Sequence, residues 1–199
     1  MAGDADVIDA LVGITPGSPL DAIRARRSQA RTHAQATYRA LFEPVSLGSF
    51  TTQERCAVGA FVAGIHGNAV VAGHLAARLA GSGAAPAYRA AVDAAVAAAV
   101  ATGPYGRYPT GSLSREDTTG PRYRADTETR RALGPHLAAA LEHAHLLVFH
   151  PRDAARTDLQ ALLDAGWSTT DIVTLSQIVA FLSFQIRVVA GLRALAGRP

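Results

Sequence analysis

Apolar residues recur at steps of three and four positions along most of this chain, which is the spacing that places them on one face of an α-helix. No segment shows the sustained alternation of apolar and polar residues that is typical of a half-buried β-strand. The pattern therefore predicts an all-α protein. Glycine and proline breaks divide it into expected helices at residues 6–11, 18–41, 52–66, 68–79, 88–101, 126–133, 135–150, 154–165 and 167–195.

The chain is organised around Phe50–Leu79, where a helix, a glycine turn and a second helix follow one another. Thr51 and Glu54 have the spacing of a capping box, in which each side chain satisfies a free backbone N–H at a helix start. Gly67 suits the left-handed conformation that ends this helix, and Asn68 suits the N-cap of the next. Two successive helices are therefore expected, the first beginning near Thr52.

The first of these helices has one expected buried face and two costly glycines. Gly59 and Gly64 each cost roughly 1 kcal/mol relative to alanine inside a helix. Close packing of another helix against each glycine would offset that cost. The buried face is marked by Val58, Phe61, Val62 and Ile65.

A related pattern returns at Trp167–Leu195, where Ser168 and Asp171 take the places of Thr51 and Glu54 at an offset of 117 residues. The same offset, applied without a gap, pairs Phe50 with Trp167, Val62 with Val179, Val71 with Val188 and Leu75 with Leu192. We interpret the segments around 50–79 and 167–195 as two copies of one helical unit.

Composition narrows the function. The 199 residues, 1–199, are expected to form a single domain. A single cysteine, Cys56, excludes an internal disulfide and any dithiol reaction within the chain. All 19 basic residues are arginine, and a formal net charge of +3 without a dense basic cluster does not indicate a nucleic-acid partner.

Two further features bear on location and on partners. Met1–Gly13 carries aspartates where a signal peptide has basic residues, and no apolar run reaches the ~18 residues that span a bilayer, so a cytoplasmic protein without a membrane partner is expected. Residues 102–124 are rich in glycine and proline and predict a long irregular loop. Its tyrosines and arginines are compatible with a lid or a partner-binding arm.

The capped helix, the turn at His66 and Gly67, and the later stretch GWSTTDIVTLSQIVAF together resemble the alkylhydroperoxidase D-like and carboxymuconolactone decarboxylase superfamily. The resemblance covers most of Ser49–Leu79 and Asp153–Leu195. It implies an alkylhydroperoxidase D-like helical bundle, with two related helical units in one domain. In the peroxidases of that family, a CxxC motif reduces peroxide while a glutamate and a histidine relay protons.

The peroxidase residues do not carry over to this chain. Aligning the turns without a gap puts Asn68 and Val71 at the two cysteine positions and Cys56 at the glutamate. Shifting the alignment by one residue recovers only His74, at the histidine. A thiol peroxidase needs an attacking thiolate and a second thiol that resolves the sulfenic acid. The resemblance therefore implies the fold without the dithiol reaction.

Cys56, His66 and His74 are the candidate catalytic residues. Cys56 lies near a helix N-terminus, where the dipole lowers a thiol pKa, although the more common role for a cysteine in such a helix is that of a small buried apolar residue. His66 and His74 are suited to general acid and base roles near neutral pH, or to turn and capping roles. No cofactor is implied.

A second group of histidines lies at seven-residue intervals and comprises His136, His143 and His150. Successive members stand roughly 10 Å apart on a continuous helix, which is too far for one shared metal ion. We interpret the stripe as a polar interface or as the lining of the loop. His143 and His145 are expected to point apart.

Three functions remain open. The first is a degenerate superfamily member that binds or acts on a small organic molecule, with weak one-cysteine peroxidase activity as a variant. The second is a non-catalytic homo-oligomer, because helices rich in alanine and glycine often pack against identical subunits. The third is a helix-turn-helix regulator, whose recognition helix would have few polar contacts to offer.

Overall fold

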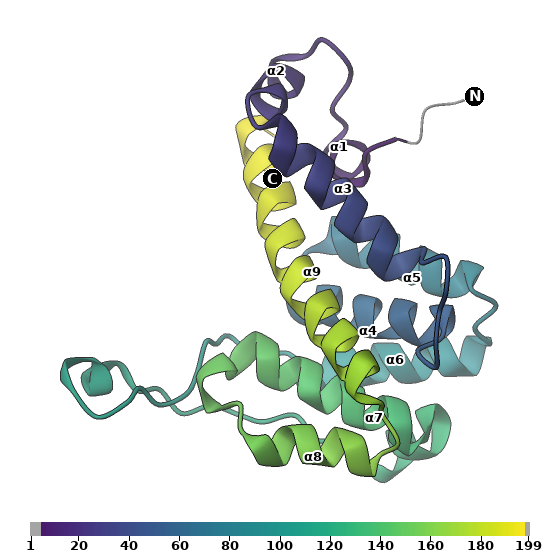
Figure 1. Ribbon diagram of the computed structural model, residues 1–199, viewed down its shortest axis with the longest axis vertical. Helices are drawn as coiled ribbons and strands as arrows, with labels where there is room; N and C mark the ends of the chain where they lie inside the picture. The colour runs from purple at the N-terminus through teal and green to yellow at the C-terminus, as the bar shows by residue number, and fades with distance from the viewer. Residues whose placement is uncertain (1–4, 198–199) are drawn as a thin grey trace.

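The computed structural model describes residues 5–197, so residues 1–4 and 198–199, with the part of the Met1–Gly13 expectation that concerns them, lie outside this description. Within the described range the regular elements are helices, apart from one isolated antiparallel bridge between Gly106 and Thr118. The all-α prediction is confirmed. The elements (Figure 1) are α1 (Val7–Val12), α2 (Pro19–Ala25), α3 (Ser28–Phe42), α4 (Thr52–Ile65), α5 (Ala69–Gly81), α6 (Pro86–Ala99), η1 (Ser112–Glu116), α7 (Thr127–Phe149), η2 (Pro151–Asp153), α8 (Arg156–Asp164) and α9 (Thr169–Leu195).

Helix α4 lies at the centre of the protein and contacts α5, α6, α7 and α9. Every residue from Arg55 to Ala63 is buried, so the helix has no solvent-facing side over this length. The sequence predicted a single buried face for this helix, whereas the structure buries its whole circumference. A helix that neighbours cover on all sides needs apolar or small residues around its whole circumference, and its alanines and glycines meet this need.

The local signals around α4 are confirmed in detail. Thr51 Oγ1 accepts a hydrogen bond from the Glu54 N–H at 3.2 Å, and Glu54 Oε2 accepts one from the Thr51 N–H at 3.0 Å. Gly67 has a φ of 69°, in the left-handed region. Asn68 Oδ1 then caps α5 by accepting from the Val71 N–H at 3.1 Å.

Helix α9 runs diagonally across the molecule from α7 and α8 to α1 and α3 (Figure 1). It is the one helix in residues 5–197 that is long and apolar enough to cross a membrane by length and composition, with half of its most apolar window buried inside the protein. The expectation that no apolar run reaches membrane length does not hold by this measure. Core helices of soluble proteins pass the same test, so the cytoplasmic location stays a prediction.

Two pairs of residues separated by the repeat offset contact each other. The rings of Phe50 and Trp167 meet edge to face with centroids 4.8 Å apart. His66 Nε2 and Ser183 Oγ, which are 117 positions apart, are hydrogen-bonded at 3.2 Å. The two segments nevertheless fold differently, because the first forms α4, a turn and α5, whereas α9 runs unbroken from Thr169 to Leu195. The duplication stays a prediction.

The long helix expected at residues 18–41 is wrong, because the structure breaks it into α2 and α3 at Arg26 and Arg27. Arg24 is buried and forms ion pairs with Asp6 at 2.7 Å and Asp9 at 2.8 Å, both at the start of α1. Arg24 therefore lies in the protein interior rather than on the solvated face that its position on an amphipathic helix would favour. These ion pairs join α2 to the start of α1, and local helical spacing does not indicate them.

Gly64 is the more crowded of the two glycines in α4. A Cβ placed there would lie 2.7 Å and 2.8 Å from the two methyl carbons of Val96 on α6. Gly64→Ala is expected to lower the free energy of unfolding by about 1 to 2 kcal/mol, because overpacking outweighs the gain in helix propensity. Denaturant unfolding measures the change.

The matched control for this substitution is Gly73→Ala in α5, where a new Cβ meets nothing within 4 Å. It is expected to stabilise the protein by roughly 0.5 to 1 kcal/mol. Adding Val96→Ala to Gly64→Ala should recover part of the loss by removing the clashing methyls. Equal effects at Gly64 and Gly73 would contradict close packing of α4 on α6.

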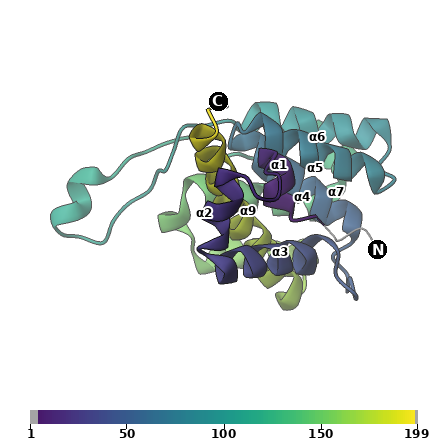
Figure 2. The ribbon, with the colours of Figure 1, turned by 90° about the horizontal axis from the view of Figure 1, so that it is seen from above.

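Residues 102–124 form an arm that projects away from the helices, as both views show (Figures 1 and 2). Its base is held by the bridge between Gly106 and Thr118 and by His150, whose Nε2 lies 2.9 Å from the Pro121 carbonyl oxygen. The residues from 109 to 113 at its tip are exposed. The irregular loop is confirmed, and its role as a lid or a partner-binding arm stays a prediction.

Candidate functional site

Cys56 and His74, two of the three predicted site residues, lie near each other. Tyr38 Oη is 2.7 Å from His74 Nε2, and electrostatic interactions link Tyr38 and Cys56 to Arg78. Arg78 in turn donates a hydrogen bond to Glu43 Oε1 at 2.7 Å. The cluster is closely packed between α3, α4 and α5.

The chemistry of this cluster is that of a buried polar network. Burial raises the pKa of the Cys56 thiol, with nearby Arg78 opposing the shift, and only 1% of the residue is exposed. Burial also raises the pKa of Tyr38 to about 12 and lowers the pKa of His74. All three groups therefore favour their neutral forms near pH 7, and a neutral buried thiol is a poor nucleophile.

His66 lies apart from this cluster in its contacts. Its Nε2 bonds Ser183 on α9, and burial lowers its pKa, with the positive charge of Arg187 contributing in the same direction. The structure gives His66 and His74 different partners, and neither histidine lines either of the two cavities described below. The catalytic roles of Cys56, His66 and His74 stay predictions.

A test of Cys56 follows directly from its burial. Purified protein with hydrogen peroxide and a small dithiol is expected to show no peroxide consumption above that of a Cys56→Ser variant, because a thiol with a raised pKa is mostly protonated and is out of reach of the solvent. A coupled or direct peroxide assay measures this. Peroxide turnover by the wild-type protein that disappears in the variant would instead support the hypothesis of one-cysteine peroxidase activity.

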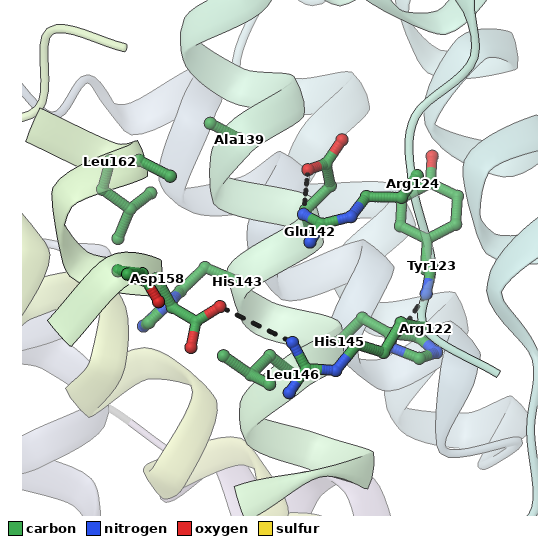
Figure 3. Close-up of a pocket in the computed structure, with 12 residues that line it drawn as sticks. Arg122, Tyr123, Arg124, Ala139, Glu142, His143, His145, Leu146, Asp158 and Leu162 are labelled. Carbon is green, nitrogen blue, oxygen red and sulfur yellow. Dashed lines mark hydrogen bonds and ion pairs between the residues drawn. The ribbon is translucent and has the colours of Figure 1, made fainter. Parts of the chain in front are cut away.

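A cavity of about 260 Å³ lies between the base of the arm, α7 and α8 (Figure 3). We call it the His143 cavity. One face of α7 and one face of α8 border it, with contributors at steps of three and four residues, so regular helix geometry brings them together. Its lining residues are Arg122, Tyr123, Arg124, Ala139, Glu142, His143, His145, Leu146, Thr157, Asp158, Ala161 and Leu162.

His143 is the unusual residue of this cavity. It is only 5% exposed, and neither ring nitrogen has a hydrogen-bond partner among the described residues. Burial lowers its pKa, with the negative charge of Asp158 opposing the shift, so the imidazole is neutral near pH 7. It thus offers one donor and one acceptor. Buried polar groups are normally satisfied, so such an exception calls for an explanation.

The charged groups around His143 differ in how many hydrogen bonds they already make within the protein. The Glu142 carboxylate already accepts hydrogen bonds from Arg124 at 2.7 Å, from the Ala125 N–H at 3.0 Å, and also from Arg130. Arg122 and Asp158 face each other at 3.7 Å, which is beyond hydrogen-bond distance. These two groups, His143 and the buried Tyr123 hydroxyl therefore have unused hydrogen-bonding capacity in the cavity.

The histidine stripe is resolved into three separate environments. His136 stacks on Trp167 with ring centroids 4.2 Å apart, and its Nδ1 lies 3.1 Å from Glu54 Oε1. His150 borders the arm, as the lining interpretation expected. His143 borders the cavity instead, and His145 points from it toward Tyr123 (Figure 3). No group of three or more potential metal ligands occurs in residues 5–197.

A second cavity, of about 300 Å³, lies between α4, α5 and α6 and is lined mainly by alanines with Leu79 and Pro86. Arg89 and Asp93 are its ionisable residues. It contains no fully buried polar side chain, so its residues offer less to recognise a specific ligand.

Comparison of the chain with known protein families, curated proteins and solved structures gave no match. The resemblance to the alkylhydroperoxidase D-like superfamily stays a prediction. Sequence reasoning singled out His143 only as part of a stripe, and it did not connect Arg122 or Asp158 with it. Helical spacing links His143 to other residues of α7, but nothing in it indicates which side chains of α8 and the arm lie opposite.

Proposed function

We propose that this protein binds a small organic molecule in the His143 cavity and that it is a degenerate alkylhydroperoxidase D-like protein without the dithiol site. The observation that carries the binding proposal is His143, which is buried with both ring nitrogens unpartnered beside a cavity. Leaving such a group unsatisfied costs about 1 to 3 kcal/mol. A ligand that hydrogen-bonds to the imidazole would recover this energy.

The distance of the only thiol from this cavity favours binding, or chemistry without redox steps, over peroxide reduction. The single thiol, that of Cys56, lies in the buried cluster with Tyr38 and Arg78. It is not among the residues that line the His143 cavity. A neutral imidazole is suited to accept a proton from a bound substrate or to orient a hydroxyl or amine. If the protein is an enzyme, His143 is therefore the proposed acid or base.

The test is a His143→Leu variant compared with wild type in thermal unfolding, alone and with a panel of small organic acids, amines, alcohols and sugars. The unliganded variant is expected to be about 1 to 2 kcal/mol more stable, because an unsatisfied polar group is replaced by an apolar side chain of similar size. Compounds that raise the melting temperature of wild type should lose this effect in the variant.

His33→Leu on the exposed face of α3 is the matched control and should leave both stability and ligand shifts unchanged. If His143→Leu is destabilised as much as a core truncation, the imidazole is part of the packing rather than of a site. If ligand shifts are equal in wild type and the variant, the ligand binds elsewhere.

The homo-oligomer expected from the alanine-rich and glycine-rich helices also stays a proposal. Val173, Phe184 and Leu195 on α9 are exposed apolar side chains of the isolated chain. Sedimentation of the purified protein determines the oligomeric state.

A further inference from the structure

Arg122 and Asp158 are opposite charges on the wall of the His143 cavity, and both have unused hydrogen-bonding capacity. Arg122 donates only a long hydrogen bond to the Asp153 carbonyl oxygen at 3.4 Å, and its carboxylate contacts are 3.7 and 3.8 Å long. Asp158 Oδ2 accepts from the Ala155 N–H at 2.9 Å, whereas Oδ1 has only the distant Arg122. Each group can therefore take a further partner from a ligand.

His143 adds a neutral acceptor next to these two charges. Figure 3 shows it beside Asp158, on the side of the cavity toward α8. A neutral imidazole nitrogen accepts a hydrogen bond from an ammonium or a hydroxyl group, whereas an imidazolium would repel an ammonium group. Among these three residues, the acceptors are one imidazole nitrogen of His143 and Asp158 Oδ1, and the donors are Arg122 and the other imidazole nitrogen.

The charge balance of these groups restricts the ligand. A simple anion would pair with Arg122 but would also approach the Asp158 carboxylate, and a simple cation would meet the reverse problem. Like-charge contacts and unpaired charges in a partly desolvated site are costly. A ligand that carries both charges satisfies both groups. The apolar part of the wall comprises Ala139, Leu146, Ala161 and Leu162, and the other lining residues are Tyr123, Arg124, Glu142, His145 and Thr157.

We propose, on the basis of the proposed function above, that the ligand of the His143 cavity is an α-amino acid with an aliphatic side chain. Its carboxylate pairs with Arg122, its ammonium group donates to Asp158 Oδ1 and His143, and its side chain lies on the apolar wall. The cavity of about 260 Å³ is smaller than the roughly 300 to 1,000 Å³ of drug-sized sites, which agrees with a small metabolite.

The test measures binding of three matched probes by isothermal titration calorimetry: L-leucine, 4-methylpentanoate, which lacks the ammonium group, and 3-methylbutylamine, which lacks the carboxylate. L-Leucine is expected to bind at least about tenfold more tightly than either analogue, since each removes one charge-assisted hydrogen-bonded pair.

Variants then assign the two charges. Asp158→Asn keeps an oxygen for the helix cap and should reduce the preference for L-leucine over 4-methylpentanoate to within about threefold. Arg122→Gln should do the same for the preference over the amine. The matched controls are Asp164→Asn at the exposed end of α8 and Arg115→Gln in the arm, which should keep the wild-type preferences.

The outcomes separate this inference from the proposed function. If L-leucine binds no better than its analogues, or binds equally well to Asp158→Asn, the amino acid is overturned. If another class of compound binds and His143→Leu abolishes its binding, the amino acid is again overturned but the binding function stands. If no compound of any class binds to the wild-type protein, both proposals fail.

Discussion

Replacement of Arg55 by methionine is expected to lower the free energy of unfolding by about 3 to 5 kcal/mol. Arg55 is 4% exposed, and its guanidinium donates to three backbone carbonyls. The distances are 2.9 Å to the Phe50 oxygen, 2.9 Å to the Leu41 oxygen and 3.3 Å to the Leu47 oxygen. Methionine fills much of the space but leaves these acceptors without their donor.

The size of the effect follows from where these carbonyls lie. They belong to the end of α3 and to the segment that leads into α4, so a single side chain holds the connection between two helices. The guanidinium also lies over the Phe50 ring at 4.7 Å from its centroid. Burial lowers the pKa of Arg55, with the negative charge of Asp171 opposing the shift, yet an arginine remains charged near pH 7.

Chemical denaturation followed by far-ultraviolet circular dichroism measures the loss. Arg131→Met, on the exposed side of α7, is the matched control and should change stability by no more than about 0.5 kcal/mol. If the two variants lose the same stability, the hydrogen bonds of Arg55 contribute little beyond packing. Arg55→Lys should recover only part of the loss, because one ammonium group does not replace a three-armed guanidinium contact.

Acidification is expected to destabilise the protein, and His145 is expected to account for about 3 kcal/mol of this loss at pH 4. Burial lowers the pKa of His145 to about 4, and the charge of His150 adds to the shift. Only 2% of His145 is exposed. An unfolded chain has the ordinary histidine pKa of about 6.5.

The sign follows from proton binding. Between pH 6.5 and pH 4 the unfolded chain binds a proton at His145 that the folded protein does not bind, so stability falls as the pH is lowered through this range. Above about pH 7.5 both states are almost entirely neutral at this residue and the contribution is constant. His66, His74 and His143 also have lowered pKa values and act in the same direction.

His145→Leu isolates the contribution of one residue. The free energy of unfolding is measured at pH 7 and at pH 4, and the drop between the two should be about 3 kcal/mol smaller in the variant than in wild type. His33→Leu, on the exposed face of α3, should show the wild-type drop. An identical drop in His145→Leu and wild type would show that folding does not lower the pKa of this imidazole.

Local signals in the sequence predicted helix ends well, because a cap depends on residues within one turn. Asp126 shows this at α7, where its Oδ1 accepts from the Thr129 N–H at 2.7 Å. Gly134, with a φ of 81°, interrupts α7 next to Pro135, where the sequence separates two helices. Such features need no knowledge of which elements become neighbours.

The features that the sequence did not predict depend on contacts between residues far apart along the chain. The break between α2 and α3 accompanies Arg24 and its carboxylate partners on α1, and the complete burial of α4 depends on four packing helices. The His143 cavity likewise joins residues from α7, α8 and the base of the arm. Periodicity indicates that a side is buried, but it does not say what lies against it.

By itself, the sequence determined the helical class, most helix ends, the glycine turn before α5 and the absence of an internal dithiol, since each depends on residue type or on residues close along the chain. Only the tertiary structure decided that Cys56 is buried, that His66 and His74 have different partners, and that His143 lines one cavity with Arg122 and Asp158. Burial, pKa and hydrogen-bond satisfaction depend on which distant residues are brought together, and helix packing determines that.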